Sequence, residues 1–383
     1  MLTIKGKHND IRVMLSDWTE LDDETHKQLL SFANFAPFEG ADIVVMPDCH
    51  AGKGCCVGTT ISDAKVVVPA LVGVDIGCGM LVQELPKPVD NFELFDATVR
   101  REVPLGFETR SSATLAIRTS NDYRFGLDIT ALCHKIGMKD DYAFRSLGTL
   151  GGGNHFIEIS SFNKQQWLVI HSGSRNLGLQ VCNYHQKKAE TLCAERGEHI
   201  PLGMAYLTGN DAKEYLADMR IAQEYAERNR EEINRAICDA VFGKDDRLDP
   251  SHCTHNYIDD TGCVRKGAIA ARDGQTCVVP LNMRDGIIFG MGKNNPLWNY
   301  SAPHGAGRSK SRSAAKRELS LEDFQNTMKG VWSSSVSQDT LDEAPEAYKP
   351  VDTILKVISE TVAIGFIAKP VYNLKAGRQE RKR

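Results

Sequence analysis

The sequence predicts a globular protein that combines β-strands with α-helices. Short apolar runs such as residues 42–46 and 167–170 have the length and composition of buried strands. Between residues 179 and 243 the pattern changes, because apolar residues recur near helical spacing. The composition, with 42% hydrophobic and 25% charged residues, is ordinary for a soluble globular protein.

The length, the absence of long apolar runs and the cysteine content narrow the class of protein further. The 383 residues can bury a substantial core as one large domain or as two or three smaller ones. No apolar run approaches the roughly 18 residues of a membrane span, and the polar N-terminus does not resemble a signal peptide. The 11 cysteines show no repeated framework, which favours reduced thiols. We therefore expect a cytoplasmic protein that does not enter a membrane.

The charge pattern limits how the protein would bind nucleic acid. The net charge is −4, so a nucleic-acid partner would have to bind a local basic patch. Residues 308–317 form one such patch, and residues 375–383 form another at the C-terminus. We expect the tail from residue 378 to be flexible.

The first half of the chain predicts several strands and two helices. Residues 2–15 alternate like an edge strand, and residues 22–35 read as a helix with acidic residues in the first turn. The strand predicted at 42–46 is followed by a glycine-rich polar loop at 47–54. Ligands often bind in loops at strand ends, but a plain turn would contain the same glycines. The other elements expected here are strands at 55–61, 65–68, 154–160 and 167–170, and a helix near 127–136.

The second half begins with helices and returns to strands. Asn210 or Asp211 is expected to cap a long helix, which is either packed on the core or forms an external arm. The charged stretch 227–235 on this helix is expected to face solvent. Strands are predicted near 268–271 and 276–279.

The stretch 72–80 contains an aspartate and a cysteine with two residues between them and three nearby glycines. Asp75 offers a hard oxygen ligand and Cys78 a soft sulfur ligand, and a thiolate can bridge two cations. Taken alone, such a motif is more often a buried free cysteine beside a turn. Other possible ligands are His155 at the head of one expected strand and His171 at the exit of another. Of His252, Cys253 and His255, which lie on one extended segment, at most two could share a ligand site.

A further histidine, His304, lies between Pro303 and Gly305 and is followed at once by the basic patch that starts at Arg308. An imidazole in this setting suits nucleophilic attack on a nucleotide phosphorus. A loop histidine beside a solvated basic helix explains the same residues when the motif is considered alone.

Considered together, these motifs resemble the RtcB family of RNA ligases. The resemblance rests on residues 48–54, 75–78, 151–158, 171–175, 255–257, 304–308 and 372–375, which occur in the family's order and span nearly the whole chain. It implies an α+β fold in which β-sheets flanked by helices surround a central metal site. It also implies one catalytic domain over residues 1–383, with a helical insertion at about 185–243 and a flexible basic tail at 378–383.

The resemblance assigns roles to individual residues. Asp75, Cys78 and His155 would hold one manganese ion, and Cys78, His171 and His255 would hold a second, with Cys78 as the bridge. His304 would attack the α-phosphate of GTP to form a histidine–GMP intermediate, with Asp48 as a second catalytic residue. The GTP site would include Asn154, Glu158, Asn282, Gly305, Gly307, Tyr348 and Lys375. Arg175 and Arg308 would bind RNA phosphates.

The implied substrate is RNA with a 3′-phosphate or 2′,3′-cyclic phosphate end, which is joined to a 5′-hydroxyl end in RNA repair or tRNA splicing. Family members often work with archease, and some relatives accompany a release-factor-like protein, so the resemblance leaves both partners open. One motif departs from the family, because residues 281–287 replace a serine-containing segment that helps to contact the nucleotide. Arg284 and Asp285 in this segment either pair with each other or face the substrate.

Two other functions use the same residues. A metal-dependent phosphodiesterase that opens cyclic phosphates would need the metal ligands but not His304. An RNA-end binding protein with structural metals would need neither a nucleophile nor a nucleotide pocket.

Overall fold

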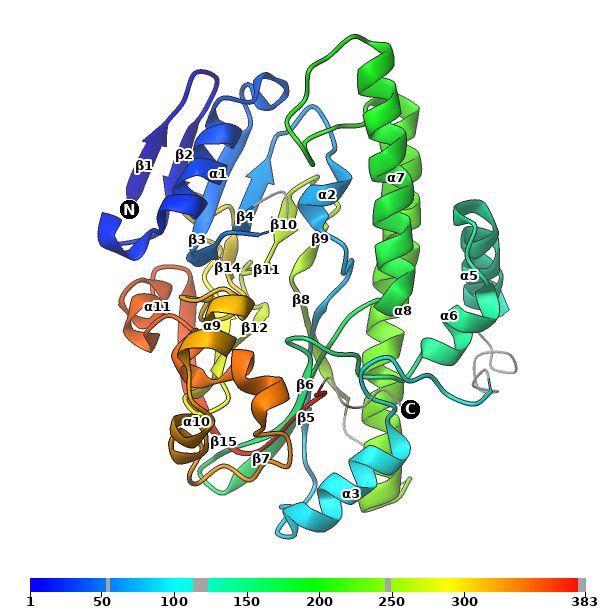
Figure 1. The fold of residues 1–383 in the computed structure, drawn as a ribbon, viewed down its shortest axis with the longest axis vertical. Helices are drawn as coiled ribbons and strands as arrows, with labels where there is room; N and C mark the ends of the chain where they lie inside the picture. Colours follow the sequence, from blue (N-terminus) through cyan, green and yellow to red (C-terminus); the bar gives the residue numbers. More distant parts are fainter. Residues whose placement is uncertain (53–55, 113–122, 245–248, 378–383) are drawn as a thin grey trace.

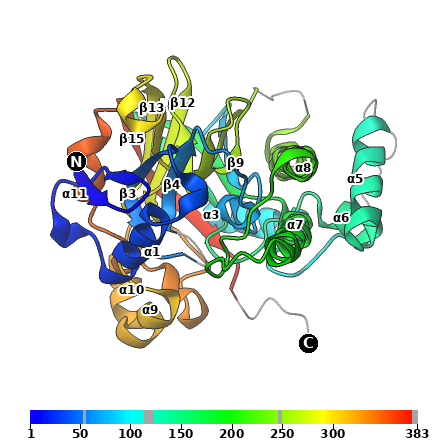
Figure 2. The same cartoon turned by 90° about the horizontal axis from the view of Figure 1, so that it is seen from above.

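The computed structural model describes residues 1–52, 56–112, 123–244 and 249–377. Two large sheets and one small sheet form the centre of the molecule, and helices cover their outer sides (Figures 1 and 2). Nearly all neighbouring strands are antiparallel. The structure therefore confirms the α+β class. The predicted flexible tail at 378–383 and residues 53–55 of the predicted loop lie outside the described residues.

The first sheet has six strands in the order β1-β2-β3-β4-β10-β9. Among its described residues the only parallel pair is β2 with β3, and helix α1 connects those two strands. The helix begins where Asp22 accepts a hydrogen bond from the Thr25 backbone N–H, which satisfies one free donor of its first turn. The bounds are β1 Leu2–Lys5, β2 Asp10–Val13, α1 Asp23–Ala33, β3 Asp42–His50, β4 Val57–Ser62, β9 Asn256–Ile258 and β10 Val264–Lys266.

Three sequence predictions in this region were wrong. Residues 2–15 form two strands, because the chain turns between them and the Gly6 N–H donates to the Asn9 carbonyl. Asp48 and His50 belong to strand β3, where we had predicted a loop. Residues 65–68 form no strand and make only an isolated bridge between Val67 and Leu207.

The second sheet has seven strands in the order β12-β13-β15-β6-β7-β5-β8. A separate pair, β11 with β14, brings the chain to the segment that contains His304. The bounds are β5 Gly79–Glu84, β6 Phe156–Phe162, β7 Gln165–Ser172, β8 Ser251–Thr254, β11 Ala268–Ala270, β12 Thr276–Asn282, β13 Gly286–Gly292, β14 Ser301–Pro303 and β15 Val362–Lys375.

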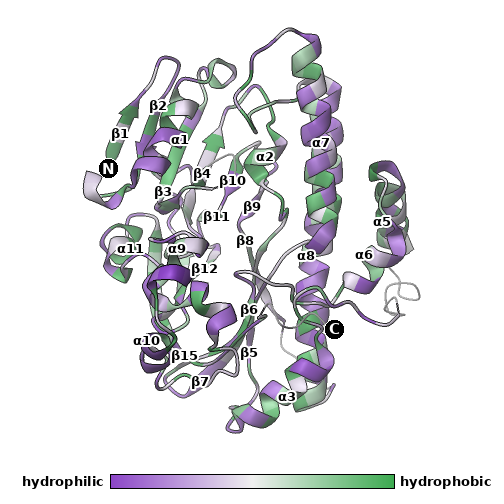
Figure 3. Ribbon diagram, viewed as in Figure 1, coloured by the Kyte–Doolittle hydropathy of each residue, from purple (hydrophilic) through white to green (hydrophobic). Residues whose placement is uncertain are grey.

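Two long helices, α7 Arg175–Glu195 and α8 Gly209–Phe242, lie side by side along one flank of the sheets (Figures 1 and 2). Figure 3 shows hydrophobic and hydrophilic segments alternating along both helices, as expected of helices with one buried face. Helix α8 packs against β5 and β7, so it belongs to the core and is not an external arm. It begins one residue before Asn210, after Thr208 at the N-cap position.

The remaining helices are short and lie around the sheets. They are α2 Pro69–Val72, α3 Phe92–Glu102, α5 Tyr123–Ile136, α6 Asp140–Ser146, α9 Arg312–Glu318, α10 Leu321–Thr327 and α11 Val351–Ile358. The described residues also form five 3-10 helices: η1 Trp18–Glu20, η2 Ala36–Phe38, η3 Pro296–Trp298, η4 Gln338–Glu343 and η5 Pro345–Ala347. Across the described ranges, no helix combines the length and the apolar character that crossing a bilayer requires.

Candidate metal centre and adjoining cavity

The pairing of β5 with its neighbours places the candidate metal ligands next to one another. Cys78 immediately precedes β5, and Met80 of that strand lies opposite His171 at the end of β7. His171 also pairs with Phe156, the residue after His155, across the β6–β7 ladder. His255 follows β8, which pairs with β5 on its other side. Strand register therefore gathers residues that are up to 180 positions apart in sequence.

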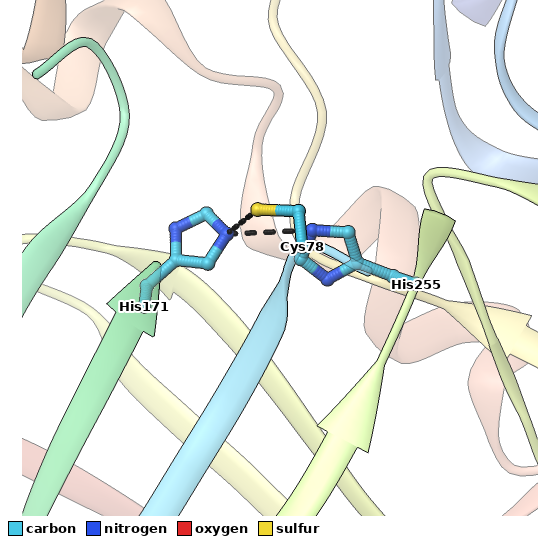
Figure 4. A group of neighbouring side chains, drawn as sticks. All are labelled: Cys78, His171 and His255. Atoms are coloured by element: carbon cyan, nitrogen blue, oxygen red, sulfur yellow. Dashed lines mark hydrogen bonds between the residues drawn. The ribbon is translucent and has the colours of Figure 1, made fainter. Parts of the chain in front are cut away.

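These side chains form two groups of possible metal ligands that share Cys78. One group is Cys78, His171 and His255, and the other is Asp75, Cys78 and His155. In each group the ligand atoms all lie within 4.8 Å of one another. Figure 4 shows the first group, in which the Cys78 Sγ to His171 Nε2 distance is 3.3 Å and the His171 Nε2 to His255 Nε2 distance is also 3.3 Å.

Hydrogen bonds from Nδ1 turn the Nε2 atoms of two histidines toward the other ligand atoms. The His155 Nδ1–H can donate to the Leu150 carbonyl at 2.9 Å, and the His171 Nδ1–H to the Asn154 carbonyl at 3.1 Å. Burial lowers the pKa of His171 and of His255 well below the usual value, so both rings are neutral. The Nε2 atoms of His171 and His255 and the sulfur of Cys78 thus form a compact set of electron-pair donors, which fits a bound cation.

The carboxylate and the thiol in the cluster ionise differently. Burial opposes ionisation of Asp75, but the hydrogen bond and charge of His155 lower its pKa to about 2. Burial first, and then the negative charge of Asp75, raise the pKa of the Cys78 thiol well above its usual value. Because a bound metal ion deprotonates a thiol ligand, binding at this centre should release a proton.

Helix α8 holds the backbone of this centre with two buried side chains. Arg230 donates from Nη1 to the Gly77 carbonyl at 2.8 Å and to the Ser172 carbonyl at 2.9 Å. Asn229 accepts from the backbone N–H of Gly148 at 2.8 Å. Both side chains are fully buried, so the prediction that residues 227–235 face solvent was wrong for them. The sequence does contain a sign that Arg230 is buried. It lies four residues after Ala226 and three before Ile233, which places all three on one helix face.

His304 stands beside the metal centre and is held by Asp48. The His304 Nδ1 lies 2.7 Å from the Asp48 Oδ2, and the backbone N–H groups of His304 and Gly305 donate to the same oxygen at 3.1 and 3.2 Å. This geometry places the Nδ1 proton toward Asp48 and leaves a lone pair on Nε2. The rings of His304 and His255 are 4.9 Å apart between centroids. Gly307, with φ of +73°, lets the next turn pass so close to the Asp48 backbone that a Cβ atom would clash.

A cavity of about 730 Å³ opens beside His304. It is large enough to enclose a ligand the size of a nucleotide. Its lining includes every residue that the family resemblance assigns to GTP: Asn154, Glu158, Asn282, His304, Gly305, Gly307, Tyr348 and Lys375.

The deep wall of this cavity contains a buried carboxyl group. Asn373 donates to Glu158 at 2.7 Å, and the hydroxyl of Ser160 donates to its other oxygen. Burial dominates and raises the pKa of Glu158 to about 7, although these hydrogen bonds and the charge of Lys375 act in the opposite direction. The group therefore changes protonation state near neutral pH.

The segment that departs from the family pattern folds into a turn of its own. The Asn282 side-chain oxygen accepts from the backbone N–H groups of Arg284 and Asp285, and its amide donates to the Asp285 carboxylate at 2.7 Å. Arg284 and Asp285 pair through two hydrogen bonds of 2.8 and 2.9 Å, so the alternative in which they pair with each other is confirmed. The polar atoms of Asn282 are thus already engaged within the turn.

Both arginines expected at RNA phosphates have partners within the protein. Arg175 donates to the Gly106 carbonyl at 2.9 Å and to the Thr149 hydroxyl at 3.1 Å. Its guanidinium passes so close to Gly151 that any larger residue there would clash. Arg308 donates to the backbone carbonyls of Lys310 and Asp342.

Glu343 is a buried residue of this region that the sequence analysis missed. Its carboxylate contacts the side chains of Lys375, Tyr348, Arg308 and Arg312. Nothing in the local pattern around residue 343 distinguishes it from a surface glutamate, because its partners come from distant segments of the chain.

The fold and this site together define a protein organised around a buried cysteine–histidine–aspartate centre at the end of a sheet, with a carboxylate-held histidine beside it. Residues 28–376 match the family described as tRNA-splicing ligase RtcB. The chain belongs to the RtcB family, which confirms the resemblance inferred from the sequence.

Individual relatives align over most of their length. The chain is 30% identical to the RNA-splicing ligase RtcB of Escherichia coli strain K12, over 94% of this chain and 96% of the relative. It is 27% identical to the tRNA-splicing ligase RtcB of Aeropyrum pernix, over 88% of this chain and 89% of the relative. It is 29% identical to the RNA-splicing ligase RtcB of Mycobacterium tuberculosis, over 81% of this chain and 91% of the relative.

Proposed function

We propose that this protein is a GTP- and manganese-dependent RNA ligase. It would join an RNA end that carries a 3′-phosphate or a 2′,3′-cyclic phosphate to an end that carries a 5′-hydroxyl. Membership of the RtcB family supports the ligase class, and relatives across the family are named RNA-splicing or tRNA-splicing ligases.

The observation that carries the proposal is the position of His304. Its Nδ1 is bonded to Asp48 at 2.7 Å, while its ring borders both the large cavity and the ring of His255. An imidazole held in this tautomer presents a nucleophilic Nε2 to a nucleotide in the cavity. A protein that only bound RNA ends would have no need of this arrangement.

The donor set fits divalent metal binding. Asp75, Cys78 and His155 would hold one ion, and Cys78, His171 and His255 the other. The assignment of manganese follows from the family resemblance. When bound, the ions would neutralise charge on the phosphates of the nucleotide and the RNA.

In the first chemical step, the His304 Nε2 forms a bond to the α-phosphorus of GTP, and pyrophosphate leaves with the electron pair of the broken P–O bond. Asp48 stabilises the positive charge that develops on the ring and keeps the proton on Nδ1. A 2′,3′-cyclic phosphate end would first be opened by water to a 3′-phosphate. An oxygen of the RNA 3′-phosphate then takes GMP, and the P–N bond to His304 breaks, which restores free His304. The 5′-hydroxyl oxygen finally attacks the activated 3′-phosphate, loses its proton and displaces GMP.

The residues that line the cavity would bind the nucleotide. Asn154 is assigned to a phosphate, and Glu158, Tyr348 and Lys375 to the guanine base. Gly305 and Gly307 would let the phosphates approach the backbone. The contact assigned to Asn282 has less support, because its amide is engaged in the turn that contains Asp285.

Arg175 and Arg308 would bind RNA phosphates after exchanging their present carbonyl partners for them. Archease or a release-factor-like protein as partner, and a cytoplasmic location, are further proposals that follow from the family resemblance.

The departure at residues 281–287 favours one alternative, a phosphodiesterase that opens cyclic phosphates without joining ends. That reaction would use the same metal ligands and would not require a nucleotide contact from Asn282.

Substitution of His304 by alanine separates these functions. With radiolabelled GTP and manganese, we expect the wild type to acquire acid-labile covalent label and to join RNA ends, whereas His304→Ala should do neither and should retain its metals. His252→Ala is the matched control, because His252 lies outside the cavity and pairs with Glu231. Ligation by His304→Ala at the wild-type rate would disprove the ligase mechanism. Opening of cyclic phosphates by a wild type that forms no adduct would establish the phosphodiesterase.

A further inference from the structure

Glu343 divides its two carboxylate oxygens between two sets of partners. Its Oε2 accepts from the Tyr348 hydroxyl at 2.6 Å and from the Lys375 Nζ at 2.9 Å. Its Oε1 accepts from the Arg312 Nη1 at 2.5 Å and faces the Arg308 Nη1 at 3.5 Å. One carboxylate therefore joins a tyrosine, a lysine and two arginines that come from three separate segments of the chain.

All four partners line the large cavity, whereas Glu343 lies behind them. A second cavity, of about 570 Å³, is lined by Glu343 together with Arg175, Arg312 and Lys316. Glu343 thus stands in the wall between the two cavities, with only 2% of its surface exposed. It does not line the large cavity, so it is not placed to contact a nucleotide there.

The electrostatics exclude a role in proton transfer. Burial opposes ionisation of Glu343, but the positive charges of Lys375, Arg312 and Arg308 lower its pKa to about 2. The group is therefore ionised at any physiological pH, and each of its oxygens is already shared between two donors. Such a carboxylate orients its neighbours and does not act as a base.

Removal of the Glu343 charge would weaken the hydrogen bonds that hold Lys375 and Tyr348 in place. The Tyr348 hydroxyl makes its hydrogen bond to Glu343, and the other hydrogen bond of the Lys375 ammonium is a longer one, 3.4 Å, to the Asn154 carbonyl. Arg312 differs, because it also pairs with the Asp342 carboxylate at 2.7 Å. Of the three residues assigned to the guanine base, Lys375 and Tyr348 thus depend on Glu343 more than Arg312 does.

We propose that Glu343 is a positioning residue of the nucleotide pocket, which fixes the Lys375 ammonium and the Tyr348 ring for binding of the guanine base. This inference rests on the proposed function, since it takes Lys375 and Tyr348 as nucleotide contacts. Those contacts lie on the base, away from the reacting phosphorus. They should contribute equally to binding of the substrate and of the transition state.

The test is a comparison of Glu343→Gln with Asp342→Asn. Glutamine keeps the shape and an acceptor but removes the charge, so its hydrogen bonds to Lys375 and Tyr348 lose their charge assistance. We expect the KM for GTP in adduct formation, and the Kd for GTP measured by equilibrium dialysis, to rise about tenfold or more while kcat stays near the wild-type value. The control Asp342→Asn alters a carboxylate that contacts Arg312 and Lys316 but none of the three residues assigned to the guanine base, so its GTP affinity should be unchanged.

A double-mutant cycle with Tyr348→Phe provides the second test. If Glu343→Gln fails to fold, Tyr348→Phe alone remains available, because it removes the hydroxyl that donates to Glu343, and an unchanged GTP affinity in that variant would overturn the inference. Tyr348→Phe should itself weaken GTP binding, and the double variant should be weaker than either single variant by less than the sum of the two effects. An unchanged GTP affinity in Glu343→Gln would overturn the inference. A fall in kcat with unchanged KM would also overturn it, because that result indicates only a smaller active fraction.

Failure of the proposed function would look different. A wild type that binds GTP but forms no adduct would disprove the ligase mechanism, yet the Kd comparison would still decide the role of Glu343. A wild type that does not bind GTP at all would overturn both the function and the inference.

Discussion

Replacement of Asp48 tests how the structure activates His304, and two substitutions should give different results. Asp48 Oδ2 accepts from the His304 Nδ1 and from the backbone N–H groups of His304 and Gly305. In Asp48→Asn the two backbone donors should keep the amide oxygen at the Oδ2 position. The oxygen would then still accept from Nδ1–H, so the tautomer of His304 should be preserved.

The expected magnitudes follow from that geometry. Asp48→Asn exchanges a charge-assisted hydrogen bond for a neutral one, a difference of about 1–2 kcal/mol, which corresponds to a roughly fivefold to thirtyfold slower formation of the histidine–GMP adduct. Asp48→Ala removes the acceptor, so the ring loses its orientation, and a loss of roughly a thousandfold or more is expected. The alanine variant should also be less stable by about 2–3 kcal/mol, because two backbone N–H groups lose their partner.

The assay is single-turnover labelling with radiolabelled GTP at saturating nucleotide and manganese. Asp42→Asn is the matched control, because Asp42 begins the same strand and pairs with Arg12 at 2.8 Å on the surface. Its labelling rate should equal that of the wild type. Equal rates for Asp48→Asn and Asp48→Ala would refute the argument that backbone donors preserve the tautomer, and wild-type rates for both would remove Asp48 from catalysis.

Three further predictions concern metal binding, stability and pH. If Cys78 bridges two ions, Cys78→Ala should lower metal occupancy at both positions and His255→Ala mainly at one, as measured by mass spectrometry; loss of a single ion in both variants would contradict the bridge. Arg230→Met should lower the free energy of unfolding in urea by about 2–3 kcal/mol, because two buried carbonyls lose a charged donor, whereas the exposed control Arg220→Met should change it by less than about 0.5 kcal/mol. The pKa of Glu158 is raised to about 7 in the folded protein, so the folded protein binds this proton more tightly than the unfolded chain does. The resulting contribution to stability is fully present below the pKa that Glu158 has in the unfolded chain, and it is lost as the pH rises through about 7. Relative to Glu158→Gln, the wild type should lose up to about 3 kcal/mol of stability between about pH 4.5 and 7, and parallel stability curves would contradict the raised pKa.

The sequence by itself determined the family, the α+β class and the types of side chain that the site contains. Helix α1 could also be predicted from sequence, since its cap at Asp22 and its apolar spacing are local features. The motif that contains Asp75 and Cys78 brings two ligand types within a few residues of each other, so its chemistry is visible without a structure. Such inferences succeed because they depend on short-range geometry and residue type.

Only the tertiary structure decided which charged side chains are buried and which partners they have. Arg230 sits in a charged stretch that favours a solvated face, yet packing of α8 against β5 and β7 buries it beside the metal centre. Asp48 lies in a strand because the pairing of β3 with β4 extends to His50, inside the predicted loop, with a register shift between Val45 and His50. Glu343 meets Lys375 and Arg312 only after β15 and α9 have packed around it. Long charged side chains can reach many partners, and their choice depends on contacts between segments that are distant in sequence, which no local pattern records.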